Sequence, residues 1–158
     1  MKQAIKRPLM RLPQAHLLAA LTCLWTAANV HAADFKSIGA APAILYDAPS
    51  EKGRKVFVAP RGMPVEVVLS YNEWVKVRDS GGDLSWVEAK QLSNRRMLTV
   101  TASNAKVRAT ADDNAAVVMT AERGVLLELS DAVASGWVRV KHRDGIVGFI
   151  KATDVWGE

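Results

Sequence analysis

Trp74 and Trp137 begin two similar segments, WVKVR and WVRVK, in which valines alternate with basic residues. A period of two is typical of β-strands, so the valines share one face and the tryptophan lies on the other with Lys76 or Arg139. A rigid aromatic ring beside a cation suits the binding of a peptide or glycan. The pattern therefore predicts a binding surface. The alternative is that both rings pack between structural units or cap their ends.

Three further side chains complete the predicted ligand-binding set. Tyr46 and Tyr71 occur only in the first half of the chain, which makes that half the better candidate for binding. Glu66 stands in an alternating segment, with Val65 and Val67 on either side of it, and is expected to point outward. We expect Glu66, Lys76 or Arg139 to pair with charges on the ligand.

The histidine and cysteine content of the chain gives little support for catalysis. His142 is the only histidine after residue 32, and the single cysteine, Cys23, precedes that point. Neither a Cys-His nucleophile nor a histidine-thiolate zinc site can be assembled from them. Acidic residues at 79–83 and 112–113 fall in turn-like segments, where such residues are common. We predict no catalytic residue, no metal and no cofactor, and keep an enzyme of unrecognised type as the last alternative.

The chain repeats itself at a spacing of about 62 residues. Segment 61–68 (RGMPVEVV) returns as 123–130 (RGVLLELS), and 43–50 returns as 105–112. Each copy reads as about five short strands separated by turns, with a single helical turn at 89–92 and at 152–155. No stretch has sustained helical periodicity. The sequence therefore predicts an all-β fold of two small barrels, packed together because the linker at 93–96 is short.

Residues 1–32 are typical of a cleaved secretory signal. A basic start precedes an apolar run at 17–28, and small residues follow at 30–32. An uncleaved anchor or a buried helix is the alternative, and the residues before Cys23 fit a lipid-attachment site poorly. We expect a periplasmic or secreted protein that meets the membrane only during export. The basic residues of this segment are Lys2, Lys6, Arg7 and Arg11.

Net charge argues against nucleic acid as a partner. The whole chain has 21 basic and 16 acidic residues, but four of the basic residues lie within 1–32, where there is no acid. Removing that segment leaves 17 basic residues against 16 acidic ones. An almost neutral protein lacks the electrostatic footprint of a nucleic-acid-binding domain.

The order of these motifs resembles the bacterial SH3-like (SH3b) domain family. The resemblance rests in the first copy on segments 48–50, 61–62, 74–77 and 86–87, and in the second on 123–124, 136–140, 148–150 and 154–155. It covers residues 35–156. The first strand of each copy and Ser85 depart from the usual pattern. The implied organisation is a signal at 1–32 followed by SH3-like domains at 35–94 and 95–158.

This resemblance implies a binding module of the cell envelope, which we also expect to be non-catalytic and monomeric. Its partner would be peptidoglycan, through the stem peptide, or another envelope protein. SH3-like domains in general contact ligands through an aromatic residue at the start of the strand that holds Trp74 here. The alternative is a structural or protein-interaction module that assembles an envelope complex through the edge strand of one barrel.

Overall fold

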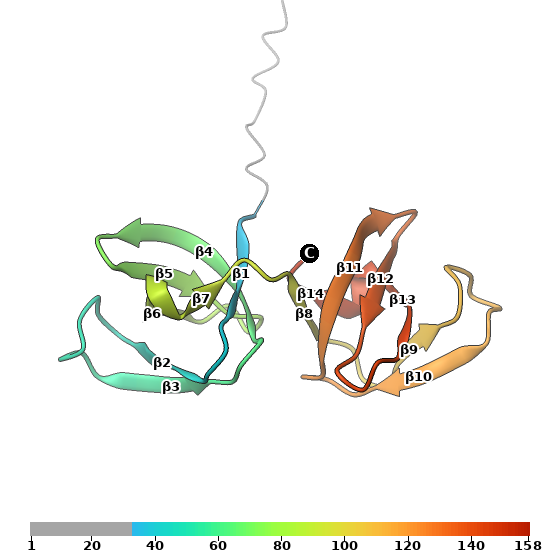
Figure 1. Cartoon of the computed structure of the whole chain (residues 1–158), viewed down its shortest axis with the longest axis horizontal. Helices are drawn as coiled ribbons and strands as arrows, with labels where there is room; N and C mark the ends of the chain where they lie inside the picture. Colours follow the sequence, from blue (N-terminus) through green and yellow to red (C-terminus); the bar gives the residue numbers. More distant parts are fainter. Residues whose placement is uncertain (1–32) are drawn as a thin grey trace, which may run out of the picture. The chain divides into compact units, whose positions relative to one another are not determined.

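The computed structural model describes residues 33–158, without the side chains of residues 132–134 (Figure 1). The predicted signal at 1–32 lies outside the described residues. Within the part that is described, no helix combines the length and hydropathy needed to cross a membrane.

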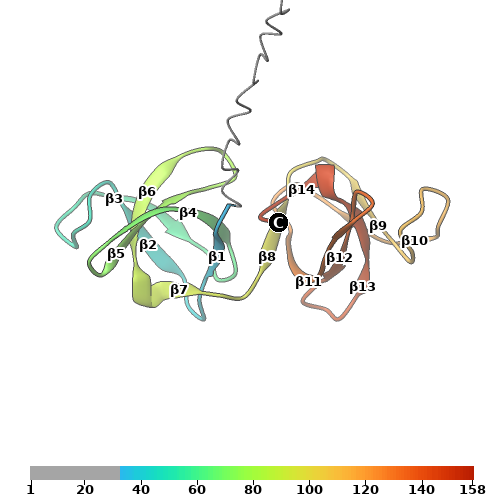
Figure 2. The ribbon, with the colours of Figure 1, turned by 90° about the horizontal axis from the view of Figure 1, so that it is seen from above.

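The described residues form two antiparallel seven-stranded sheets, each of which curls round on itself (Figures 1 and 2). The strand order is β3-β2-β6-β5-β4-β1-β7 in the first sheet and β10-β9-β13-β12-β11-β8-β14 in the second. The prediction of an all-β fold with two similar units is therefore confirmed. The strands of the first sheet are β1 (Phe35–Ile38), β2 (Ala43–Tyr46), β3 (Lys55–Ala59), β4 (Pro64–Tyr71), β5 (Trp74–Arg78), β6 (Leu84–Glu88) and β7 (Leu92–Ser93).

The second sheet has the same order displaced by seven strands, as a repeat requires. Two short 3-10 helices, η1 (Ala89–Gln91) and η2 (Ala152–Asp154), occupy the places where single helical turns were expected. The strands of the second sheet are β8 (Met97–Val100), β9 (Ala105–Arg108), β10 (Val117–Ala121), β11 (Leu126–Ala134), β12 (Trp137–Lys141), β13 (Val147–Lys151) and β14 (Val155–Trp156).

Backbone hydrogen bonds repeat at the Arg-Gly turns. Gly62 N donates to Ile38 O at 2.9 Å, and Gly124 N donates to Val100 O at 2.8 Å. Both glycines have positive φ, 79° and 86°. Because that conformation disfavours residues with a Cβ atom, glycine follows arginine in both copies.

Each sheet encloses its own small apolar core. In β5 and β12 the valines are buried while the tryptophans are only partly buried, so the predicted alternation is confirmed. The first core consists of Ile38, Ala43, Leu45, Ala59, Val65, Val75, Val77 and Val87. The second consists of Leu98, Val100, Ala105, Val107, Ala121, Leu127, Val138, Val140, Ile150 and Val155.

The expectation of about five strands in each copy was too low, because each has seven. β1 lies in a segment for which the sequence pattern predicted no strand, and it pairs with both β4 and β7. Its Ser37 and Ile38 are both buried, which breaks the alternation that would reveal a strand. β7 and β14 have only two residues each and are too short to show a period.

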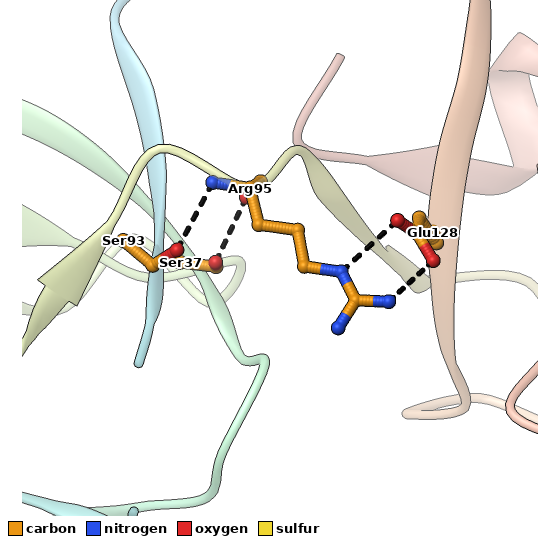
Figure 3. A network of polar contacts seen from close by, with 4 residues as sticks. All are labelled: Ser37, Ser93, Arg95 and Glu128. Atoms are coloured by element: carbon orange, nitrogen blue, oxygen red, sulfur yellow. Dashed lines mark hydrogen bonds and ion pairs between the residues drawn. The ribbon is translucent and has the colours of Figure 1, made fainter. Parts of the chain in front are cut away.

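The linker contacts strands on both sides of it (Figure 3). Arg95 N donates to Ser93 Oγ at 3.1 Å, and Ser37 Oγ donates to Arg95 O at 2.8 Å. The guanidinium of Arg95 makes a two-pronged contact with Glu128 of β11, with Nε 3.0 Å from Oε1 and Nη2 bonded to Oε2. Hydrogen bonding to Arg95, together with the charges of Arg95 and Lys141, lowers the pKa of Glu128.

The pairing predicts how stability depends on pH. A lowered carboxyl pKa contributes stability above the pKa of the unfolded chain, and this contribution is lost as pH falls through the folded value. We expect Glu128→Gln to lower the free energy of unfolding at pH 7 by about 0.5–1 kcal/mol, a figure that allows for solvent screening. The difference from wild type should begin to shrink as pH falls below about 4.3, the ordinary glutamate pKa, and should vanish only below the lowered pKa of folded Glu128.

Urea unfolding at pH 7 and at a series of acid pH values measures this effect. Glu122→Gln is the matched control, because Glu122 is exposed and forms no ion pair within the described residues. If Glu128→Gln lowered the free energy of unfolding equally at every pH, the stabilising role of the Glu128–Arg95 ion pair would be contradicted.

Candidate ligand-binding surface

Four aromatic side chains gather on the side of the first sheet that faces away from its core. We call Tyr46, Tyr71, Trp74 and Trp86 the aromatic surface. The Tyr46 and Trp74 rings meet edge to face, with centroids 5.4 Å apart and planes at 89°. Tyr71 is the partner of Trp74 across the β4–β5 hairpin, and Trp86 is the partner of Tyr46 across β2 and β6. Directly paired residues share a face, so the four belong to one surface.

A tight hairpin places Tyr71 beside Trp74. Only Asn72 and Glu73 separate β4 from β5, and Asn72 adopts a left-handed φ of 51°. Asparagine tolerates this conformation better than most residues, and two-residue hairpin loops favour it. From Trp74 the alternation of β5 carries the same face to Lys76, whose ammonium lies 5.9 Å from the centroid of the Trp86 ring.

Carboxylates border the aromatic surface. Glu88 is the strand partner of Trp74, and its Oε1 lies 2.9 Å from Nζ of Lys90. Hydrogen bonding to Glu88 and the charge of Glu88 raise the pKa of Lys90, with smaller effects from Glu51 and Glu73. Three carboxylates therefore act on the charge of one lysine at this border.

The second sheet keeps the tryptophan but changes what surrounds it. Trp137 pairs with Lys151, whose ammonium lies 5.6 Å from the ring centroid. Arg139 is exposed, and its Nη1 lies 3.2 Å from Asp131 Oδ2. Arg108 is the partner of Phe149, as Tyr46 is of Trp86 in the first sheet. A hollow of about 240 Å³ beside Trp137 includes Arg108 and Lys151 in its lining.

The predicted site residues fall into separate groups. Tyr46, Tyr71 and Trp74 come together, and Lys76 joins them through Trp86. Tyr46 is only 9% exposed and Tyr71 is 57% exposed, so they differ in access to a ligand. Glu66 pairs with Arg78 at 2.8 Å, at the opposite end of β5 from Trp74.

Trp86 was missing from the predicted set. The signal was present in Ser85-Trp86-Val87. Val87 is fully buried in the core, and alternation then forces Trp86 onto the outer face.

Two of the acidic residues weighed for chemistry, Asp79 and Asp112, stabilise turns. Oδ1 of Asp79 accepts hydrogen bonds from the backbone N–H groups of Gly81 and Asp83 at 2.8 and 2.9 Å. Oδ1 of Asp112 accepts from Asn114 N at 2.6 Å. Nδ1 of His142 lies 3.3 Å from Asp144 Oδ2. Among residues 33–158, no group of three or more histidine, cysteine or acidic side chains could hold a metal ion.

Comparison with known proteins identifies one family. The family model described as "Bacterial SH3 domain" matches residues 39–94 and 101–157 of this chain. The sequence matches no curated protein.

Solved structures to which this chain shows similarity include NlpC2 and NlpC1 of Trichomonas vaginalis, each 13% identical, with TM-scores of 0.37 and 0.38 over 80% and 84% of this chain. An NlpC/P60 family protein of Bacillus cereus ATCC 10987 is 17% identical, with a TM-score of 0.35 over 77% of this chain. The match covers 49%, 48% and 55% of those three chains, so this chain spans about half their length.

Burial predicts different roles for the two tyrosines. We expect Tyr46→Ala to reduce the free energy of unfolding by about 2–4 kcal/mol, because it removes a buried ring and its contact with Trp74. Tyr71→Ala should cost less than about 0.5 kcal/mol, because most of that side chain is in solvent. Chemical denaturation of both variants checks the prediction, and equal losses would contradict it.

Proposed function

Because the chain belongs to the bacterial SH3 domain family and carries two of its domains in tandem, we propose that it is a non-catalytic binding module of the cell envelope. The first repeat binds peptidoglycan peptide or an extended protein segment across the aromatic surface. The protein acts after export, as a monomer. The SH3 family supports a binding role over a catalytic one.

The observation that carries this proposal is the aromatic surface itself. Only Tyr46 is buried, so core packing does not account for the clustering of the other three rings. Tyr71 is largely exposed, while Trp74 and Trp86 are partly exposed and are braced by Tyr46 and Lys76. Preordered aromatic side chains lose little conformational freedom on binding, which is why they dominate many recognition sites. The carboxylates at its border complement protonated amines of a peptide.

Co-sedimentation with isolated peptidoglycan tests the proposal. Protein of residues 33–158 should pellet, and combining Tyr71→Ala with Trp74→Ala should weaken binding about tenfold or more, since recognition aromatics carry large shares of binding energy. Phe57→Ala is the matched control, because it removes a half-exposed ring from β3 at the sheet edge. Circular dichroism confirms that each variant folds. Undiminished pelleting of the double variant would overturn the role of the aromatic surface.

A second candidate function rests on the exposed edge strand β3. β3 ends the strand order of the first sheet, and Val56, Phe57 and Val58 are exposed along it, Val58 to 64%. An apolar strand at a sheet edge can accept a strand from another protein. This would make the chain an interaction module that assembles an envelope complex.

Crosslinking in whole cells separates the two candidates. If β3 is the working surface, Val58→Lys should abolish crosslinks to an envelope protein, because a lysine on an edge strand disfavours strand addition. The variant with Tyr71→Ala and Trp74→Ala should then keep those crosslinks. The reverse pattern would rule out the edge-strand function.

A further inference from the structure

Corresponding positions in the two repeats carry opposite charges beside equivalent tryptophans. Trp74 pairs with Glu88, whereas Trp137 pairs with Lys151. The β5–β6 and β12–β13 hairpins have the same register. The reversal of charge therefore comes from the residues at these positions and not from a shift in strand pairing. Two further positions change in the same direction: Tyr46 corresponds to Arg108, and Ile44 corresponds to Lys106.

The hollow beside Trp137 is built from several strands of the second sheet. Its lining contains three basic side chains and two carboxylates. The remaining lining residues are uncharged, and all of them except Trp137 are small. A site with a net charge of +1 suits a monoanion better than a doubly charged phosphate. The lining residues are Ala102, Ser103, Asn104, Ala105, Lys106, Arg108, Asp113, Trp137, Lys151 and Asp154.

The cations of this hollow keep hydrogen-bonding capacity. Lys151 Nζ lies 2.7 Å from Asp113 Oδ1 and has two further N–H donors. Nη1 of Arg108 donates to Ala115 O at 2.7 Å, which uses one of the five guanidinium donors. The side chain of Asp113 is 65% exposed, so its ion pair with Lys151 is weak and open to competition.

We propose that the hollow beside Trp137 binds the carboxylate of a peptide ligand. Lys151 supplies the counter-charge, Arg108 supplies further donors, and the Trp137 ring packs against the apolar part of the ligand. The first repeat does not take this group, because Glu88 and Tyr46 stand where Lys151 and Arg108 stand in the second. The inference deepens the proposed function, on which it rests, by assigning the anionic group of the ligand to one repeat.

The test follows the indole N–H signals of Trp74 and Trp137 by NMR in protein of residues 33–158. The probes are N-acetyl-alanyl-alanine with a free carboxylate and the same peptide as its amide. The free acid should shift the Trp137 signal and leave that of Trp74 in place, and the amide should shift neither. An amidated peptide that contains one glutamate tests which carboxylate is bound. A shift of the Trp137 signal with this peptide indicates binding of a side-chain carboxylate, and no shift indicates that the chain terminus is required.

Two substitutions should change affinity in opposite directions. Lys151→Glu copies the charge of the first repeat and should weaken binding of the free acid about tenfold or more, since it replaces attraction by repulsion. Asp113→Asn removes the competing carboxylate and should tighten binding about two- to fivefold, in line with an exposed ion pair. Arg143→Glu is the matched control, because Arg143 is exposed on the same sheet's β12–β13 turn and is absent from the hollow.

Equal shifts of Trp137 by acid and amide, or unchanged affinity in Lys151→Glu, would overturn the inference. These outcomes are distinct from failure of the proposed function. Peptidoglycan that does not pellet the wild type, together with a carboxylate-dependent Trp137 shift, would reject the envelope ligand and keep the carboxylate site.

Discussion

The structure depends on burying the valines of two short strands. Val75 and Val77 of β5, and Val138 and Val140 of β12, are each at most 5% exposed. A repeat of about 60 residues can bury few side chains, so these positions hold a large share of its apolar core. Alternation along the strands then presents every second residue on the other face, where packing does not select it. Fixing the core thereby leaves Trp74 and Trp137 partly exposed on the outer face.

Repetition lets the two copies diverge while they keep one fold. The backbone bonds of the Arg-Gly turns recur in both sheets, and the β5–β6 and β12–β13 hairpins have the same register. The outer face is freer to change, because a charge there meets solvent and costs little stability. Glu88 and Lys151 show the result, since equivalent backbone positions carry opposite charges beside equivalent rings. The same scaffold thus offers two surfaces of different chemistry.

The sequence predicted those parts of the fold that periodicity and repetition can reveal. The valine alternation placed Trp74 on the outer face, and the repeat showed that two units exist. Elements without a period were missed, as β1 was, because both Ser37 and Ile38 are buried. Contacts between distant segments also escape a local pattern. Tyr46 and Trp74 were both candidates, but their edge-to-face contact depends on how β2 and β5 are placed around β6.

Trp156 shows why a local interpretation of an aromatic residue is incomplete. Within the second repeat, Trp156 pairs with Thr99 of β8. The ring also meets Phe35 of β1 edge to face, with centroids 4.9 Å apart, and the Arg96 guanidinium lies 6.0 Å from the Phe35 ring. With the contact between Arg95 and Glu128, these side chains join the end of one sheet to the start of the other. A linker of so few residues is therefore held by side chains from both repeats.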